Sequence, residues 1–296
     1  MTHFDFSAWS SAHLARIEQA LQEWVPVQAP ASLGEAMQYA VLAGGKRLRP
    51  LLALAACESL SGHANAALRA ACSVELIHAY SLVHDDMPCM DNDVLRRGKP
   101  TVHVKFGQAT ALLAGDALQA LAFELLTPQD GSVPDAIQAK LCALLARAAG
   151  EAGMAGGQAI DLASVGKALS EAELKKMHEL KTGALLQASV MMGAACGSAT
   201  PEQTQALLTY GHAMGLAFQV VDDILDVTAD SATLGKTAGK DAEANKPTYV
   251  SILGMQRSQD YAKQLYNQAT AALDDKLLAN TTALRCLADM VVQRVY

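Results

Sequence analysis

Apolar residues recur along most of this chain with the spacing of an amphipathic helix. In the stretch SAHLARIEQALQEWV, the intervals between successive apolar positions are three, four and three residues, at Leu14, Ile17, Leu21 and Trp24. Such intervals place the apolar side chains on one face of a helix. The same period continues through EAELKKMHELKTGALLQASVMMGAA, and runs that alternate β-branched and polar residues are nearly absent. The pattern therefore predicts an all-α protein.

Turn-forming residues separate the predicted helices without dividing the chain. They occur in VPVQAP near 25–30, in TPQDGSVP at 127–134 and in GSATP at 197–201. We find no linker long enough to separate two domains and no repeat of fixed period, so residues 1–296 are expected to form a single domain. The polar stretch 228–247 contains three lysines and many small residues, and is expected to be a long, lid-like loop.

The hydrophobic content of the chain raises the question of whether it spans a membrane. Hydrophobic residues make up 51% of the chain and the mean hydropathy is +0.14. The best candidate for a membrane span, residues 183–200, contains Gln187 and Ser189 among small residues, which favours a buried helix and no stable membrane insertion. The first residues have no basic start followed by an apolar block, so no signal peptide is expected.

Charge and cysteine content exclude further classes. The net charge of −7 argues against a general nucleic-acid binder, so an anionic ligand must be met by a local basic cluster. The six cysteines, at 57, 72, 89, 142, 196 and 286, have no CxxC spacing. They fit small core residues in a reducing, cytoplasmic compartment better than disulfides or a zinc site.

Two aspartate clusters follow apolar stretches. In FQVVDDILDV, Asp222 and Asp226 are one helical turn apart, so both carboxylates lie on one face. In LVHDDMPCMDNDVLRRG, Pro88 lies between Asp85 and Asp91 and is expected to kink or loop the chain, which could bring these carboxylates together. Neighbouring carboxylates repel each other, and a hard dication such as Mg²⁺ removes that cost. For either cluster alone, the alternative is a solvated acidic helix face.

Two basic clusters complement the acidic ones. AGGKRLRP places Lys46, Arg47 and Arg49 after a Gly-Gly turn, and VLRRGKP places Arg96 and Arg97 just past the first aspartates. Arginine binds phosphate oxygens in a bidentate manner. For the first cluster alone, an exposed basic turn at the start of a helix is the alternative. Together the four clusters favour a substrate whose diphosphate is bridged to the aspartates by Mg²⁺.

The order of these motifs resembles the trans-isoprenyl diphosphate synthases, most closely the bacterial farnesyl diphosphate synthases (geranyltranstransferases). The resemblance covers most of the chain and rests on seven motifs in sequence: GGKRLRP, HAYSLVHDDMPCMDNDVLRRGKPTVH, GGQAIDL, KTGALL, FQVVDDILD, LGKTAGKD and NKPTYVSILG. It implies a helical bundle around a deep central cavity, a homodimer, and two aspartate motifs that face each other. It also implies ionisation of an allylic diphosphate (dimethylallyl or geranyl) and attack by the double bond of isopentenyl diphosphate.

The resemblance assigns roles to individual residues. Three Mg²⁺ ions would be held by Asp85, Asp86, Asp91, Asp222, Asp223 and Asp226. The isopentenyl diphosphate would be bound by Gly45, Lys46, Arg49, His78 and Arg97, and the allylic diphosphate by Arg96, Lys181, Lys236 and Lys246. For His78, a core histidine bonded to the backbone is the alternative. Thr182 and Gln219 would place oxygens near the developing cation. Gln158 and Asp161 would be partners of residues that contact the substrates or metal ions. Solvated positions are expected for Asn92 and Asp93, and an inert one for Cys89.

Product length is expected to depend on Tyr80. Farnesyl-producing relatives carry an aromatic residue five positions before the first aspartate, which here is Tyr80, while Ser81 is small and should line the same wall without closing it. The resemblance therefore implies a fifteen-carbon product, with a twenty-carbon product, geranylgeranyl diphosphate, as the alternative.

Three other functions are less compatible with the motifs. A terpene cyclase usually carries an Asn/Ser/Glu metal motif in place of the second aspartate cluster and needs no isopentenyl site. An HD-type phosphohydrolase needs further histidine ligands, and none is suitably spaced. A non-catalytic partner subunit typically loses one aspartate motif, whereas both are present here.

Overall fold

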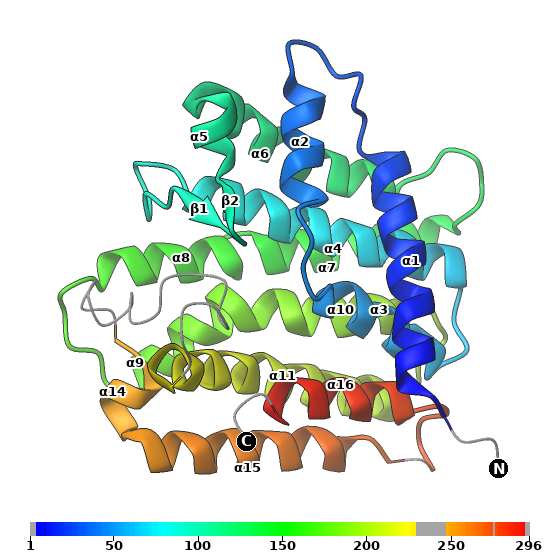
Figure 1. Ribbon diagram of the computed structural model, residues 1–296. Coiled ribbons are helices and arrows are strands. Elements are labelled where there is room, and N and C mark those ends of the chain that lie inside the picture. The colour runs from blue at the N-terminus through cyan, green and yellow to red at the C-terminus, as the bar shows by residue number, and fades with distance from the viewer. Residues whose placement is uncertain (1–3, 229–246, 275, 294–296) are drawn as a thin grey trace.

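The structure, a computed structural model, describes residues 4–228, 247–274 and 276–293. In these ranges the only strands are β1 (Leu95–Arg96) and β2 (Lys99–Pro100), which pair antiparallel as a short hairpin. The remaining regular structure is helical, so the all-α prediction is confirmed (Figure 1).

The helices divide into two groups along the chain. The first comprises α1 (Phe6–Trp24), α2 (Leu33–Val41), α3 (Leu48–Glu58), α4 (Ala64–Asp85), α5 (Val102–Phe106), α6 (Gln108–Leu126) and α7 (Asp135–Ala149). The second comprises α8 (Met154–Ala163), α9 (Glu171–His178), the π-helical turn η1 (Glu179–Gly183), α10 (Ala184–Ala195), α11 (Pro201–Thr228), α14 (Tyr249–Leu253), α15 (Met255–Ala272) and α16 (Thr282–Val292).

The sequence pattern accounts for where several helices begin. The helix expected over residues 11–25 is part of α1, which buries Ile17 and Leu21 and begins after Asp5, whose side chain accepts a hydrogen bond from the N–H of Ala8. A capping box between Ser170 and Glu173 begins α9. From there the chain is helical to the end of α10, as the period predicts, but η1 interrupts the α geometry. That local widening was not expected.

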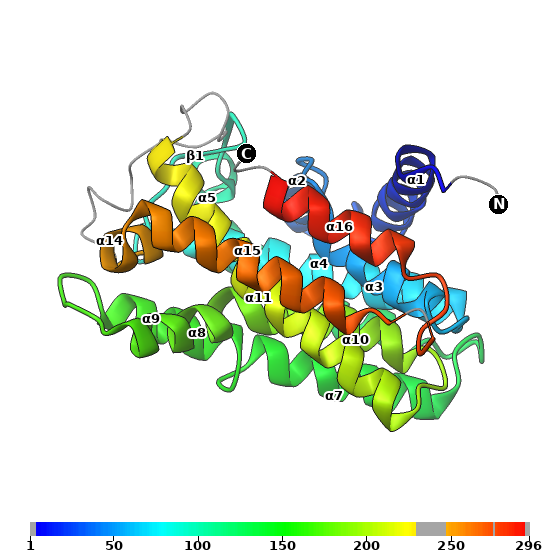
Figure 2. The same cartoon turned by 90° about the horizontal axis from the view of Figure 1, so that it is seen from below.

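Helix α4 is central to the packing. It packs against α3 and α6, while α10 packs against α3 and α11, and α15 runs along α11 (Figures 1 and 2). Buried apolar side chains contributed by helices from α1 to α16 form one core cluster. Both acidic motifs lie at carboxyl-terminal helix ends, because Asp85 is the last residue of α4 and Asp226 lies in the last turn of α11.

Two helices, α4 and α6, are long and apolar enough to cross a membrane by length and composition alone. Within its most apolar window α4 is 67% buried inside the protein, whereas α6 is 39% buried and leaves Leu112 and Leu113 exposed. Most of the segment 183–200 forms α10, which is buried as predicted. One side of α6 therefore presents an apolar surface.

Candidate active site

The first acidic motif forms a tight turn at the end of α4. The backbone N–H of Asp91 donates to the carbonyl of Asp85 at 2.8 Å, and that of Asp93 donates to the carbonyl of Asp86 at 3.1 Å. The chain therefore loops back around Pro88, which lies beyond the end of the helix. This confirms that the proline segment loops the chain and brings the backbone of Asp91 back to Asp85.

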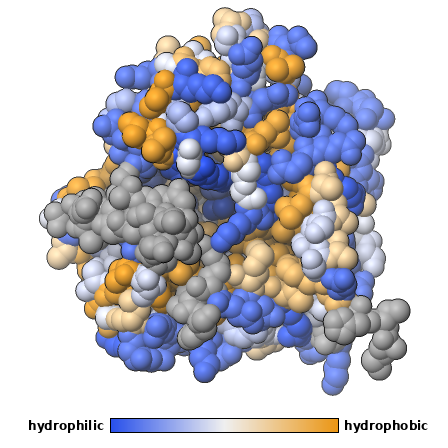
Figure 3. Space-filling view, viewed as in Figure 1, coloured by the Kyte–Doolittle hydropathy of each residue, from blue (hydrophilic) through white to orange (hydrophobic). Residues whose placement is uncertain are grey.

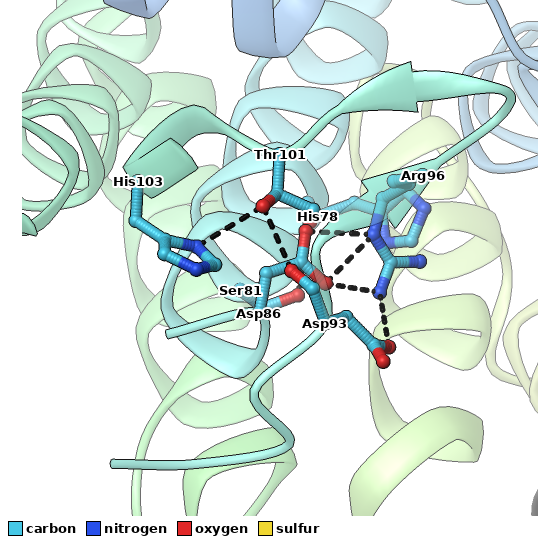
Figure 4. Close-up of polar contacts among 7 residues, drawn as sticks. All are labelled: His78, Ser81, Asp86, Asp93, Arg96, Thr101 and His103. Atoms are coloured by element: carbon cyan, nitrogen blue, oxygen red, sulfur yellow. Dashed lines mark hydrogen bonds and ion pairs between the residues drawn. The ribbon is translucent and has the colours of Figure 1, made fainter. Parts of the chain in front are cut away.

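Arg96 neutralises the second aspartate of this motif. Its Nε lies 3.0 and 2.9 Å from the two carboxylate oxygens of Asp86, and one Nη lies 2.5 Å from Oδ1 (Figure 4). Burial works to lower the pKa of Arg96, but the hydrogen bonds and charge of Asp86 outweigh it and raise the pKa. Asp93 lies 3.9 Å from the same guanidinium, so the expectation that Asp93 is merely solvated was wrong. The hairpin β1–β2 brings Arg96 back to the turn, a tertiary arrangement that the sequence does not show.

Asp85 has different surroundings. Burial raises its pKa to about 6, the charge of Lys181 opposes this rise, and the charge of Asp91 adds to it. A carboxylate that is partly desolvated and close to a second carboxylate gains from a nearby cation. Oxygen donors of this kind suit Mg²⁺. The described residues contain no gathered group of three aspartate, glutamate, histidine or cysteine side chains, so a metal site there needs oxygens from outside this set, such as those of a diphosphate or water.

The second acidic motif lies on α11. Asp222 and Asp226 are one turn apart on this helix, as predicted. The carboxylate of Asp223 accepts hydrogen bonds from Nε2 of Gln219 at 2.8 Å and from the backbone N–H of Tyr249 at 2.7 Å. Asp223 is thus tied to the protein by both oxygens.

The π-helical turn η1 carries two of the predicted site residues. Nζ of Lys181 donates to Asp161 at 2.5 Å, and Oγ1 of Thr182 donates to Oε1 of Gln219 at 3.0 Å. Gly157 of α8 allows η1 to approach, because a Cβ at this position would lie 2.1 Å from the backbone N of Lys181. Widened helical turns are frequent at functional sites. Asp161 is therefore a direct partner of Lys181.

A cavity of about 400 Å³ joins several predicted residues with others that the sequence did not single out. Its lining contains the predicted Arg49, His78, Tyr80, Ser81, Asp85, Gln158, Lys181 and Thr182, and also Leu82, His84, Met90, Met154, Ala155, Ala159 and Leu162. On the face shown in Figure 3, hydrophilic residues surround a recess near the centre. No motif marks the apolar members of this set, because they resemble other core residues of their helices.

Of the basic residues near the cavity, some line it and others donate hydrogen bonds to oxygens of the protein. Burial lowers the pKa of Arg49, and its Nε is buried without a hydrogen-bond partner among the described residues. Burial, followed by the charges of Arg49 and Arg97, lowers the pKa of His78 well below its usual value and keeps the ring neutral. Arg97 donates to the carbonyl of Gly44. Arg47 is buried and bonded to protein carboxylates, so it does not belong to the phosphate-facing set in which its motif placed it.

Several predicted residues lie elsewhere. Lys46 and Gly45 are exposed, and a Cβ on Gly45 would lie 3.0 Å from the guanidinium of Arg97. Lys236 and Lys246, like nearly all of the expected lid at 228–247, lie outside the described residues. Gln158, in contrast, lines the cavity, and both of its amide atoms are buried without a partner in the described ranges.

The cysteines fit the core only in part. All six are free thiols, and those at positions 57, 72 and 196 are buried. Cys89 is exposed on the turn after α4, so it does not fill the core as the composition suggested.

Proteins of known family and structure resemble this chain in sequence and in fold. A family model described as "Polyprenyl synthetase" matches residues 30–281. The chain is 44% identical over 292 residues to a chloroplastic geranylgeranyl pyrophosphate synthase of Catharanthus roseus, covering 98% of this chain and 82% of the relative. It is similar to the crystal structure of an FPP/GFPP synthase from Zymomonas mobilis, with a TM-score of 0.86, 40% identity, and coverage of 97% of this chain and 98% of that one. A geranylgeranyl pyrophosphate synthetase from Pyrococcus horikoshii has a TM-score of 0.88, 32% identity and 98% coverage of both chains.

Proposed function

The chain belongs to the polyprenyl synthetase family and extends prenyl chains, and we propose that it condenses isopentenyl diphosphate with an allylic diphosphate in the cavity beside α4. The observation that carries the proposal is the lining of that cavity. Asp85, Lys181 and Arg49 supply charges that suit diphosphates, while Leu82, Met154 and Leu162 supply an apolar surface that suits a hydrocarbon tail.

Aspartates of the two acidic motifs, together with Lys181 and Thr182, would ionise the allylic substrate. Mg²⁺ held by Asp85 and Asp91, and by Asp222 opposite, would neutralise the departing diphosphate. Lys181 would add a positive charge beside the same group. Because Thr182 donates its hydroxyl hydrogen to Gln219, the Thr182 oxygen presents lone pairs, which would stabilise the allylic cation.

The basic residues near α3 would hold the isopentenyl diphosphate. Arg49 offers a buried Nε that an anionic oxygen can accept from, and the neutral ring of His78 lines the same cavity. The double bond would then attack the cation, and the released diphosphate would take the proton. This route needs no separate general base from the protein.

Two observations bear on the product. The relatives support a twenty-carbon geranylgeranyl product better than the farnesyl product expected from the sequence, because a curated relative at 44% identity is named a geranylgeranyl pyrophosphate synthase. The fifteen-carbon product is the second candidate, because Tyr80 lines the cavity and would limit its depth.

Product analysis tests both levels of the proposal. The protein is incubated with Mg²⁺, isopentenyl diphosphate and, separately, the five-, ten- and fifteen-carbon allylic diphosphates, and the products are identified by liquid chromatography and mass spectrometry. Chain growth with diphosphate release supports elongation. Cyclised or merely hydrolysed products, or none, contradict it. Extension of the fifteen-carbon substrate to twenty carbons favours the geranylgeranyl product.

The apolar side of α6 fits a homodimer. Leu112 and Leu113 are 47% and 56% exposed, and Val104 on the neighbouring α5 is 50% exposed. Such a surface suits an interface with a second copy. Light scattering coupled to size exclusion tests it, with Leu113→Glu expected to shift the mass to that of a monomer. We also propose a cytoplasmic location, since thiols such as Cys89 suit a reducing compartment.

A further inference from the structure

Arg47 is the residue of the basic motif that points into the protein. Its side chain is 1% exposed, and its three guanidinium nitrogens all donate to protein oxygens. Nε donates to Glu18 on α1 at 2.6 Å, one Nη donates to Glu75 on α4 at 2.7 Å, and the other donates to the carbonyl of Val41 at the end of α2 at 2.7 Å. One side chain thus connects the basic motif to three helices.

The backbone at Arg47 has a conformation that most residues avoid. Its φ is 49°, in the left-handed region, and it directly precedes the first residue of α3. Gly44 and Gly45 before it also have positive φ values, 84° and 140°. A non-glycine residue persists in this region only where its surroundings hold it there. The bonds made by the Arg47 side chain are such a restraint.

The two arginines of the motif have opposite environments. Arg47 is paired with Glu18 and Glu75, whereas Arg49, two residues later, lines the cavity and keeps a buried Nε without a partner in the described chain. Of these two arginines, Arg49 presents its charge to the cavity, whereas the charge of Arg47 is compensated within the protein.

Glu75 connects this restraint to the cavity wall. It lies one helical turn before His78 on α4, and His78 lines the cavity together with Arg49. The ion pair between Arg47 and Glu75 therefore fixes the basic motif to the same stretch of α4 that presents His78. On the opposite side of the loop, Arg97 donates to the carbonyl of Gly44.

We infer that Arg47 is a positioning residue: its forked contacts with Glu18 and Glu75 hold the Gly-Gly-Lys-Arg turn so that Lys46 and Arg49 can receive the diphosphate of isopentenyl diphosphate. The inference rests on the proposed function and assigns Arg47 itself no contact with substrate. Loss of the fork weakens binding of isopentenyl diphosphate and leaves binding of the allylic diphosphate unchanged.

The variants are chosen to remain folded. Removing Arg47 alone would leave Glu75 buried and uncompensated, which is strongly destabilising. Arg47→Lys keeps the charge but loses the planar fork. Arg47→Met combined with Glu75→Gln removes both buried charges together. Glu18→Gln weakens only the partner whose side chain is 43% exposed.

The matched control is Arg69→Lys. Arg69 is a half-buried arginine on α4, the helix that carries Glu75. Its guanidinium lies 5.0 Å from the ring centre of Trp24, and it donates to the carbonyl of Leu125 at 3.1 Å. Its replacement changes stability without touching the basic motif. A purely structural role of Arg47 would give the Arg47 variants the same pattern as this control.

Steady-state kinetics and calorimetry together test the inference. For Arg47→Lys we expect KM for isopentenyl diphosphate to rise about tenfold (about 1.4 kcal/mol), KM for the allylic substrate to stay within twofold, and the control to change neither value. Titration calorimetry with isopentenyl diphosphate alone should show the same weakening without any reaction. If Arg47→Lys fails to fold, two other variants replace it. We expect Glu18→Gln to raise KM for isopentenyl diphosphate by less than tenfold, and the double variant Arg47→Met, Glu75→Gln to raise it by about tenfold.

The outcome that overturns the inference alone is distinct from failure of the proposed function. Folded Arg47 variants that bind isopentenyl diphosphate with wild-type affinity would exclude the positioning role. A wild-type protein that does not bind isopentenyl diphosphate would contradict the proposed function and the inference together. A wild-type protein that binds isopentenyl diphosphate but never elongates an allylic substrate would contradict the proposed reaction, while calorimetry would still decide the role of Arg47.

Discussion

Asp85 and Asp86 are adjacent in the chain but have opposite electrostatic surroundings. The carboxylate of Asp86 is held by Arg96 at 2.5 to 3.0 Å, whereas burial raises the pKa of Asp85 to about 6. One aspartate is therefore compensated within the protein, and the other gains from an added cation.

Replacing these two aspartates should have separable effects. We expect Asp85→Ala to lower the elongation rate by several orders of magnitude while leaving the thermal midpoint unchanged or higher, because it removes a repelling charge. Asp222→Ala should act similarly on the rate. Asp86→Asn should cost about 1–2 kcal/mol of stability, because it breaks a charge-assisted fork. Elongation assays and thermal unfolding measure both, and near-wild-type elongation by Asp85→Ala would contradict the assignment.

Stability without divalent metal should depend on pH through Asp85. Its pKa is about 6 in the folded protein and ordinarily 3.8, so the folded state binds a proton that the unfolded state releases across that interval. The Asp85 contribution is therefore most favourable below about pH 4 and is lost as the pH rises to about 6. In a chelating buffer, Asp85→Asn should match wild type near pH 4 and unfold at a higher temperature at pH 7. If the two proteins have equal midpoints at pH 7, the buried charge of Asp85 carries no such penalty.

Tyr80 should set product length. Its side chain is buried and lines the cavity. Tyr80→Ala should open space for at least one further isoprene unit and shift the products toward longer chains. Ser81→Phe, on the same wall, should shorten them.

The control for product length is Tyr39→Ala, because Tyr39 lies outside this cavity and bonds the carbonyl of Pro100. Mass spectrometry of the products from all three variants provides the comparison. Identical product lengths for wild type and Tyr80→Ala would make Tyr80 an ordinary core residue.

Two glycines near η1 should respond differently to the same change. Gly157→Ala would place a Cβ 2.1 Å from the backbone N of Lys181, so we expect η1 to shift, with lower stability and at least tenfold lower turnover. Gly183→Ala meets its nearest atom at 3.4 Å, an ordinary contact, and should be tolerated. Circular dichroism and elongation rates of the pair measure the difference. Equal behaviour of the two variants would show that the close approach of α8 to η1 has no functional importance.

Local sequence patterns were enough to predict which stretches are helical and which residue types can carry the chemistry. Helical period is a local property, so α1 follows from the spacing of apolar residues alone. The turn that returns Asp91 to Asp85 was also predictable, since a proline acts on the backbone next to it.

Which charged groups face the cavity depends on how the helices pack, and local sequence patterns did not predict it. Arg47 and Arg49 belong to one motif, yet Arg49 lines the cavity and Arg47 does not. Arg47 instead pairs with Glu18 of α1 and Glu75 of α4, which pack beside it. In the same way, the β1–β2 hairpin places Arg96 beside Asp86, to which it donates hydrogen bonds. The partner of a long charged side chain depends on which helices pack around it. Contacts between segments that are distant in the sequence cannot be predicted from the spacing of residues within one segment.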